Sequence, residues 1–318
     1  FEKRLPCHLE SVLRALKPFK KRLEKIAVES TYNWYWLVDG LQDHGYPVVL
    51  ANPAAMEQYN GLKHADDKSD GFFLAEMARL DILPTGYICE RAVRAVRDLL
   101  RRRMGLVHKR TSLILSLKSL HMRVTGRDLG TGAIKALEPQ DAEKLFEHPA
   151  DQLITRLDLQ LVEQLGRSIQ QIEAAILATV KKLPDYQVLQ SIPGVGKILG
   201  MTIALETVDP KRFASPGDYA SYCRCVDSRR LSNGKKKGEN NSKCGNQYLA
   251  WAFVEAAQLA RRHDDRCRRF HDRKSAQVNK IVATKALACK LAKAAWHMMR
   301  ENTPYDAERI FPGAKKQI

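Results

Sequence analysis

Between residues 151 and 183 an apolar side chain recurs at every third or fourth position, which predicts one very long helix. At about 1.5 Å per residue such a helix is roughly 50 Å long, more than an ordinary globular core covers, so the pattern predicts a coiled-coil arm. A second long helix is expected from Cys89 to about Arg123, with Gly105 as a point where it can break. The stripe comprises Ile154, Leu157, Leu161, Leu165, Ile169, Ile172, Ile176, Val180 and Leu183.

The residues before this arm alternate helical and extended patterns in a βαβ order. The apolar runs at 26–28 and 48–50 are typical of strands buried on both faces, which predicts a mostly parallel sheet covered by helices. Ligands bind at the carboxyl ends of such strands, and Glu29 occupies that position. The expected division is a truncated α/β domain at 1–88, a helical arm at 89–190, a mainly α domain at 191–302 and a loosely ordered tail at 303–318.

The charge of the chain indicates a polyanionic partner. Its 318 residues carry a formal net charge of +17, which favours nucleic acid and, as a weaker alternative, an anionic membrane surface. No apolar run is long enough to cross a bilayer, so no membrane insertion is expected.

Seven cysteines without a C-x-x-C pair fit a reducing cytoplasm, and a zinc site built on Cys223, Cys225 and Cys244 with His263 or Cys267 fits poorly.

Two carboxylates fall at the expected start of a helix within 64–80. Asp66 is a plausible N-cap, and Asp67 and Asp70 share one face of the first turn. Carboxylates in this arrangement can hold Mg²⁺, which prefers oxygen ligands and bridges to phosphate. The alternative is that they only stabilise the helix dipole.

Three features suggest contact with a nucleic-acid backbone. The IPGVGK turn resembles a helix-hairpin-helix, in which Gly194 and Gly196 free the backbone and Lys197 adds charge; an ordinary helix–helix turn is the alternative. A polar loop at 228–243 surrounds Ser232 with cations, which fits phosphate contact and also a serine nucleophile. The basic residues of this loop are Arg229, Arg230, Lys235, Lys236, Lys237 and Lys243. The third feature is a basic helix face that comprises Arg91, Arg94, Arg97 and Arg101 with Arg102 and Arg103.

Taken together, these segments resemble the DEDD transposases of the "insertion sequence one-ten" family, the bridge-RNA-guided recombinases of bacterial mobile elements. The segment IAVES supplies Glu29, and DDKSDGFFLAEMARLDILP matches the closing acidic motif with Asp67 and Asp70. The stretch from IPGVGK to ASYC resembles the start of the family's C-terminal transposase domain, and SNGKKKG places the nucleophile at Ser232. The chain departs from the pattern at Gly71 and Asn233, and the first-strand Asp has no counterpart, so an N-terminally truncated member is expected.

The resemblance implies a RuvC-like, RNase H-fold catalytic domain and a definite chemistry. Glu29, Asp67 and Asp70 would hold Mg²⁺ in a two-metal type of site, and Ser232 would form a covalent serine–DNA link. The implied partners are donor and target DNA, a structured guide RNA and further copies of the chain in a dimer or tetramer. The implied location is the bacterial cytoplasm, at the nucleoid when the enzyme is active.

Two other functions fit the same residues. A non-catalytic nucleic-acid-binding remnant of such an element would need neither the acids nor Ser232. A RuvC-like junction nuclease, which cleaves DNA with water, would need the acids alone.

Overall fold

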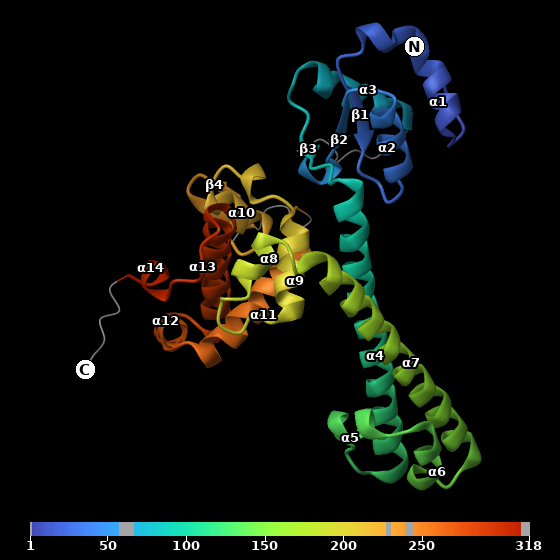
Figure 1. The fold of residues 1–318 in the computed structure, drawn as a ribbon, viewed down its shortest axis with the longest axis vertical. Coiled ribbons are helices and arrows are strands. Elements are labelled where there is room, and N and C mark those ends of the chain that lie inside the picture. The colour runs from blue at the N-terminus through green and yellow to red at the C-terminus, as the bar shows by residue number, and fades with distance from the viewer. Residues whose placement is uncertain (1, 57–66, 227–229, 239–243, 313–318) are drawn as a thin grey trace. The chain divides into compact units, whose positions relative to one another are not determined.

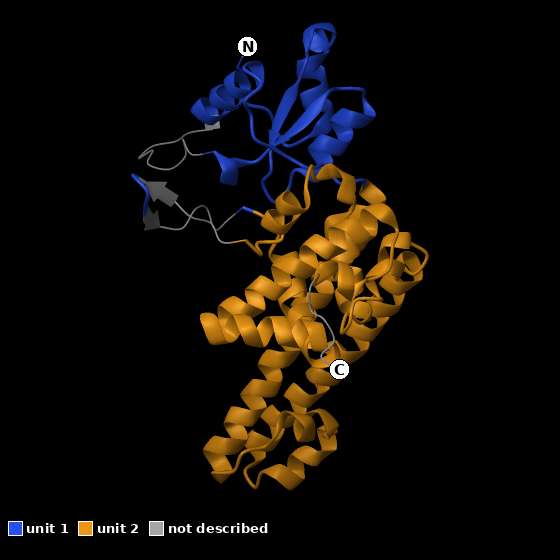
Figure 2. Ribbon diagram, turned by 90° about the vertical axis from the view of Figure 1, so that its left-hand side faces the viewer, with its two compact units in different colours: residues 1–90, 228–244 blue, residues 91–227, 245–318 orange. Residues whose placement is uncertain are grey.

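The chain packs as two compact units, residues 1–90 with 228–244 and residues 91–227 with 245–318 (Figure 2). The computed structural model describes residues 2–56, 67–226, 230–238 and 244–312, and it is mostly helical with two small sheets (Figure 1). The segment 228–244 therefore belongs to unit 1, although its neighbours in the sequence on both sides belong to unit 2. None of the helices in these ranges is long and apolar enough to span a membrane.

Unit 1 contains a three-stranded sheet in the order β1-β2-β3. β1 and β2 pair in parallel, Ile26 with Val48 through Glu29 with Ala51, which confirms the expected parallel pair joined by a helix. A short third strand, absent from the prediction, pairs antiparallel with β2. The elements are α1 (Leu9–Leu16), η1 (Lys17–Arg22), β1 (Ile26–Glu29), α2 (Tyr35–Asp43), β2 (Val48–Ala51), η2 (Pro53–Ala55), α3 (Asp67–Arg79) and β3 (Thr85–Gly86).

Both faces of this sheet are covered. Val28 and Leu50 pack with Val38 and Leu41 of α2 on one face. On the other face Ala51 packs with Leu74 of α3, and the partly buried Ala27 joins that cluster. Since side chains alternate along a strand, Glu29 lies on the same face as Ala27, the face that α3 covers.

Unit 2 contains the two long helices, α4 (Arg91–Thr125) and α7 (Pro149–Val180), which lie side by side (Figure 1). They run antiparallel, since Arg103 pairs with Glu173 near one end and Leu117 packs in one cluster with Leu159 near the other. Gly105, where the helix could break, does not interrupt α4, which is continuous from Arg91 to Thr125. The short elements between the two helices are α5 (Thr131–Ala136), η4 (Pro139–Asp141) and α6 (Ala142–Leu145).

The predicted apolar stripe of α7 is buried only along its second half. Ile169, Ile176 and Val180 are buried, whereas Ile154, Leu157 and Leu161 are about half exposed. In the first half Leu159 and the polar Thr155 are buried instead, one face further round the helix. The rotation arises because Ile134 of α5 packs against Leu159, so this end of α7 is covered from another side.

The remaining helices of unit 2 enclose the largest core, with α13 at its centre. Alanines of α11 and α13 are buried there and let these helices pack closely. The elements are α8 (Pro184–Leu189), α9 (Lys197–Thr207), η5 (Pro210–Arg212), α10 (Pro216–Tyr222), α11 (Gln247–His263), α12 (Asp265–Gln277), α13 (Lys280–Glu301) and α14 (Ala307–Ile310).

The expectation of a loosely ordered tail from residue 303 is wrong for its described part. Asp306 caps α14 by accepting from Glu308 N, and Phe311 is buried. The backbone N–H of Tyr305 donates to Ser191 Oγ at 2.8 Å. Two prolines in the tail suggested irregular chain, but Tyr305, Ile310 and Phe311 add apolar surface to the core. Residues 313–318 lie outside the described part.

Candidate functional site

The predicted acidic residues belong to two elements of unit 1 that pack on each other. Glu29 ends β1, Asp67 begins α3 and Asp70 follows one turn later. Asp70 lies on the same face of α3 as Leu74 and Met77, which pack against the sheet. Asp66, the predicted N-cap, lies outside the described residues.

An ion pair shows the direction in which α3 runs against the sheet. Lys25, just before β1, pairs with Asp81, just after α3. The end of α3 therefore lies near the start of β1, and the first turn of α3 lies toward the end of β1. Glu29 therefore lies at the carboxyl edge of the parallel pair, where ligands bind in such sheets, and the first turn of α3 lies toward that edge. That Asp67 and Asp70 meet Glu29 there stays a prediction.

The chemistry of this edge suits a hard cation. Within the described part of the chain, no lysine or arginine pairs with Glu29 or Asp70, so neither carboxylate has a competing cation. Oxygen donors of this kind are the ligands that Mg²⁺ takes. No group of three His, Cys, Asp or Glu side chains close enough to hold a metal occurs among the described residues, a set that leaves out the side chain of Asp67.

The segment predicted as a polar loop forms a β-hairpin. β4 (Arg230–Ser232) pairs antiparallel with β5 (Lys235–Gly238), and Ser232 lies opposite Lys235. Asn233 and Gly234 form the two-residue turn with φ of +53° and +71°, the left-handed geometry that Asn-Gly turns favour. Asn233 therefore fits this turn, and Ser232 is the last strand residue before it. Arg229 and Lys243 lie outside the described residues.

Cys244, which follows the hairpin in the sequence, contacts the segment after β2. The Cys244 thiol at its end donates to the Ala54 carbonyl oxygen at 3.4 Å. Ala54 lies in η2, directly after β2, and Ala51 at the end of β2 pairs with Glu29. Cys244, twelve residues after Ser232, therefore lies near the end of β2 in the same compact unit, and residues 239–243 between the hairpin and Cys244 lie outside the described part. No sequence motif predicts this contact, because Cys244 and Ala54 are far apart in the chain.

Arg101 belongs to a buried polar network in unit 2. Its Nε and Nη2 donate to the two carboxylate oxygens of Glu206, each at 2.7 Å, and the Glu206 side chain is fully buried. The Asn246 amide donates to the same carboxylate at 2.7 Å. Burial disfavours the charge of Arg101, but its hydrogen bonds to Glu206 and the charge of that carboxylate outweigh burial and raise the pKa of Arg101. Arg101 is therefore positively charged and already paired.

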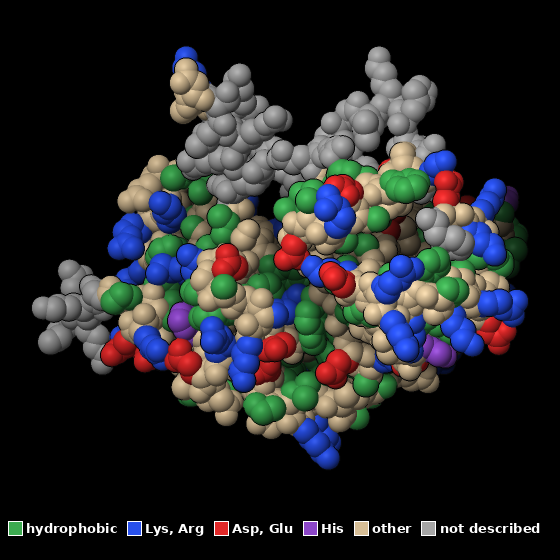
Figure 3. Space-filling model, turned by 90° about the horizontal axis from the view of Figure 1, so that it is seen from above, with side chains coloured by type: hydrophobic (Ala, Val, Ile, Leu, Met, Phe, Trp, Pro, Cys, Tyr) green, Lys and Arg blue, Asp and Glu red, His purple; other side chains and the backbone are tan. Residues whose placement is uncertain are grey.

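The predicted basic face of α4 is only partly available for nucleic acid. Arg94 is 5% exposed and Arg101 pairs with Glu206, so these two correct the prediction that both contact nucleic acid. Both face the interior because α4 packs between other helices of unit 2. Arg91 and Arg102 are exposed. Lys and Arg side chains are spread across the surface shown in Figure 3, with Asp and Glu between them.

The predicted glycine hairpin connects α8 and α9. Gly194 has φ of +83°, and Gly196 is the N-cap residue of α9. Gly196 and Lys197 are exposed, so the start of α9 is open to a ligand. Gly194 lies on the opposite side of the turn, against the backbone of Leu259 and Ala260 in α11. A helix-hairpin-helix role for this turn stays a prediction.

We expect Gly194→Ala to destabilise unit 2 by at least about 2 kcal/mol, because it combines a left-handed backbone with overpacking. A Cβ at this position would lie 2.5 Å from the Leu259 Cβ and 3.0 Å from the Ala260 nitrogen. Gly196→Ala is the matched control, since a Cβ there meets nothing within 4 Å, and we expect a loss within about 1 kcal/mol. Urea unfolding of both variants measures the difference, and equal losses would contradict this account of Gly194.

The cysteines considered as zinc ligands are buried thiols. Cys223 and Cys225 are buried, and burial raises the pKa of both, that of Cys225 to about 12. Zinc binds the thiolate, and these groups keep their protons at neutral pH. Cys267 is likewise buried, beside the Tyr305 hydroxyl. These thiols pack in the core and form no metal site with other described residues.

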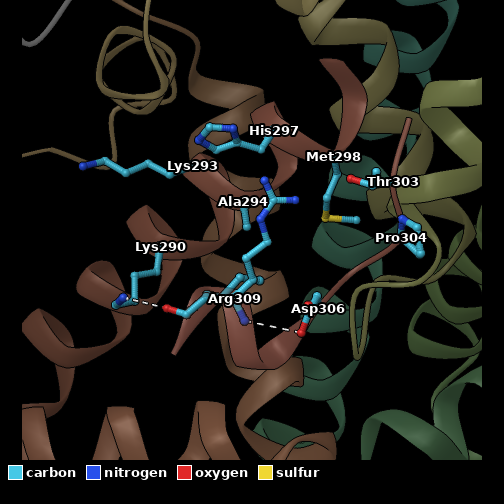
Figure 4. Close-up of a pocket in the computed structure, with 10 residues that line it drawn as sticks. Lys290, Lys293, Ala294, His297, Met298, Thr303, Pro304, Asp306 and Arg309 are labelled. Atoms are coloured by element: carbon cyan, nitrogen blue, oxygen red, sulfur yellow. Dashed lines mark hydrogen bonds between the residues drawn. The ribbon is translucent and has the colours of Figure 1, made fainter. Parts of the chain in front are cut away.

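A basic pocket that the sequence analysis missed lies between α13 and the segment before and within α14 (Figure 4). Its volume is about 280 Å³, and Lys290, Lys293, His297 and Arg309 contribute basic side chains. Most of these groups already have partners. The Lys290 ammonium donates to the Ile310 carbonyl oxygen, and His297 and Arg309 both contact Glu301. The spacing of Lys290, Lys293 and His297 on one helix face was the sequence signal for this pocket.

Two protein-family models match the chain, one near its N-terminus and one in its C-terminal half. Residues 6–123 match a model for DEDD transposases of IS110, described as a transposase. Residues 186–272 match a model described as the transposase IS116/IS110/IS902 family. Glu29, Asp67 and Asp70 lie in the first range and Ser232 in the second. The DEDD match implies an RNase H-like fold, with which the parallel pair of unit 1 agrees.

Individual relatives carry transposase names, and two of them are transposases of insertion sequence elements. The chain is 25% identical over 288 residues to the transposase for insertion sequence element IS1111A of Coxiella burnetii. This match covers 86% of the chain and 76% of the relative. It is 23% identical over 256 residues to a putative transposase of Sinorhizobium fredii, covering 77% of this chain. The match spans 61% of that relative's length. A third relative, the transposase for insertion sequence element IS1328 of Yersinia enterocolitica, is 26% identical over 50% of each chain.

Proposed function

The chain belongs to the IS116/IS110/IS902 family of transposases, and on that premise we propose that it cleaves and exchanges DNA strands with Mg²⁺ and a serine nucleophile. The membership confirms the resemblance that the motifs predicted. The observation that carries the proposal is the arrangement of unit 1. Glu29 ends β1, α3 with Asp67 and Asp70 in its first turn packs against β1, and the hairpin that bears Ser232 belongs to the same compact unit, which supports the proposal.

Glu29, Asp67 and Asp70 are the residues that would hold Mg²⁺. When bound, the ion supplies Lewis-acid polarisation of a phosphoryl oxygen. The protein would contribute the orientation of the carboxylates, because Leu74 of α3 packs with Ala27 of β1 and Ala51 of β2. The N-terminus of α3 carries the positive end of the helix dipole and would favour a phosphate bound at these acids.

Ser232 supplies the nucleophile in this proposal. Its Oγ forms a bond to the phosphorus of the scissile phosphodiester, the bond from phosphorus to the 3′-oxygen breaks, the serine loses its proton and the 3′-oxygen gains one. The products are a serine–DNA ester and a free 3′-hydroxyl for exchange with a second duplex. The exposed Lys235, paired with Ser232 across the hairpin, contributes positive charge where the phosphoryl oxygens gain negative charge.

The proposed partners are donor DNA, target DNA and a structured RNA that selects the target. The net charge of +17 supports binding to polyanions. On the hairpin Arg230, Lys235, Lys236 and Lys237 would contact backbone phosphates, as would Lys197 at the start of α9. These contacts give affinity without sequence preference, so the choice of site is assigned to the RNA.

A homo-oligomer completes the proposed assembly. Ile154, Leu157 and Leu161 form an exposed apolar row on α7, spaced three and four residues apart. Such a row is what one long helix presents to another in an oligomer. We propose that a second copy of the chain covers it, in a dimer or tetramer.

An adduct assay tests the proposed function. The protein, expressed from its complete reading frame, is incubated with donor DNA, target DNA, the RNA encoded beside the element, and Mg²⁺. We expect a protein–DNA adduct that survives denaturation, and we expect chelation of Mg²⁺ with EDTA to prevent it. Cleaved DNA with a free 5′-phosphate and no adduct would indicate a water-using junction nuclease. Binding without any cleavage would indicate a non-catalytic remnant.

A further inference from the structure

The basic pocket between α13 and the segment that leads into α14 has a firmly held outer wall (Figure 4). The backbone N–H of Tyr305 donates to Ser191 Oγ at 2.8 Å at one end of this wall. At the other end Ile310 and Phe311 pack on the main core of unit 2. The Lys290 ammonium donates to the Ile310 carbonyl oxygen at 3.0 Å and lies 5.2 Å from the centre of the Phe311 ring. The pocket is therefore formed before a ligand binds, which lowers the cost of binding.

Three basic side chains of the pocket keep hydrogen-bonding atoms that no other described residue uses. Lys293 is exposed, and within the described part of the chain its ammonium has no hydrogen bond or ion pair. Arg309 contacts Glu301 through Nη2 at 3.0 Å, but a guanidinium has five N–H groups to donate. His297 contacts the same carboxylate through Nδ1 at 3.0 Å, so its Nε2 is left for a ligand. In Figure 4 the Arg309 guanidinium lies between His297 and Met298.

Positive charge exceeds negative charge around this cavity. Lys290, Lys293 and Arg309 line it, and Asp306 is the one acidic residue in the lining. The Asp306 Oδ1 accepts from the backbone N–H groups at the start of α14, at 2.8 and 3.3 Å, so this oxygen is already occupied. Even when Glu301 is counted with Asp306, the three cations leave a surplus of positive charge. The pocket is therefore suited to an anion.

The cavity has room for more than an inorganic anion. Its volume is about 280 Å³, close to the lower end of the range of about 300–1,000 Å³ that is usual for small organic ligands. Ala294, Met298 and Pro304 give part of the lining an apolar surface. A ligand that fits both parts has an anionic group for the cations and an apolar ring for these side chains. A nucleotide has both, and its phosphate is a group that Arg and Lys bind well.

We propose that this pocket binds one nucleotide, with the phosphate on Lys293, Arg309 and His297 and the base or sugar against Met298. The nucleotide is either a free nucleoside monophosphate or one unit of a nucleic-acid strand, since both present the same groups. All the residues of the pocket belong to unit 2. The inference therefore does not depend on the chemistry proposed for unit 1.

Calorimetric titration of the full chain with three small probes tests this inference. Adenosine 5′-monophosphate carries a terminal phosphate, a thymidine dinucleotide carries only one backbone phosphodiester, and inorganic phosphate lacks the nucleoside. EDTA is present, so that no divalent metal ion recruits a probe elsewhere. The test variant is Lys293→Gln. Lys280→Gln is the matched control, because Lys280 is also an exposed lysine of α13 but does not line the pocket.

We expect the wild type and Lys280→Gln to bind at least one nucleotide probe with a Kd below about 1 mM, and Lys293→Gln to bind it at least about tenfold more weakly. Arg309→Gln should weaken the same probe by a similar factor, since each exchange removes one charged hydrogen bond to the phosphate. Tighter binding of adenosine monophosphate would identify a free nucleotide or a strand end as the ligand. Tighter binding of the dinucleotide would identify a unit within a strand.

Three results would overturn the inference. The first is a wild-type protein that binds neither nucleotide probe at concentrations up to about 10 mM. The second is an equal loss of affinity in Lys280→Gln and Lys293→Gln, which would mean that only the net charge of the chain attracts the probes. The third is binding of inorganic phosphate as tight as that of both nucleotide probes, because the apolar part of the pocket would then contribute nothing.

Discussion

Ser232→Ala is expected to eliminate the covalent protein–DNA adduct and to slow strand cleavage by at least about 10³-fold, as loss of a nucleophile does in other covalent enzymes. Alanine has no oxygen to attack the phosphodiester, while the hairpin that places residue 232 is set by the Asn233–Gly234 turn and not by the serine. DNA binding should therefore stay unchanged. Denaturing gel electrophoresis of labelled DNA measures the adduct, and a filter-binding titration measures the affinity.

Ser242→Ala is the matched control for this variant, because Ser242 belongs to the same segment of the sequence. We expect it to form the adduct at close to the wild-type rate. If Ser232→Ala still forms an adduct, the nucleophile is another residue and the assignment of Ser232 is wrong.

Asp70→Asn is expected to slow cleavage by about 10²- to 10³-fold, because a metal ion supplies several kcal/mol of charge stabilisation in the transition state. The amide keeps the shape of the side chain and removes the charge that would hold Mg²⁺. Stability should fall by less than about 1 kcal/mol, the contribution of an acid in the first turn of a helix. Cleavage rates over a Mg²⁺ titration and a thermal melt measure the two effects.

Glu76→Gln is the control on the same helix. Glu76 lies near the other end of α3, where it pairs with Arg79 on the surface, away from the edge that holds the acids. We expect wild-type cleavage from it, since exposed ion pairs contribute little. A Mg²⁺ dependence of Asp70→Asn identical to that of the wild type would contradict a role for Asp70 in metal binding.

The family and the α/β start of the chain follow from local patterns in the sequence. Continuous apolar runs such as Val48–Leu50 define strands buried on both faces, and the acids at Asp67 and Asp70 mark a helix start. The two long helices were predicted within a few residues of their observed ends. In each case the information lies within a short stretch of sequence.

Features that depend on distant parts of the chain were missed. One local feature was missed as well: the Asn233–Gly234 turn pairs the lysine-rich residues 235–237 with residues 230–232, although that composition suggests a solvated loop. The sequence around Arg101 predicts a surface cation. In the fold Arg101 pairs with Glu206, which lies far along the chain. The first half of α7 has apolar side chains on two adjacent faces. The position of α5 decides which of the two faces is buried.

Peptide mapping of the adduct tests the central claim most directly. The protein is trapped on donor DNA with RNA and Mg²⁺, the DNA is digested to a short remnant, and mass spectrometry locates the nucleotide on the tryptic peptides. We predict that the remnant is attached to Ser232 and that no adduct forms in EDTA. A remnant on any other residue, or cleaved DNA with no remnant on the protein, would contradict the claim that the acidic edge and the hairpin of unit 1 form one active site.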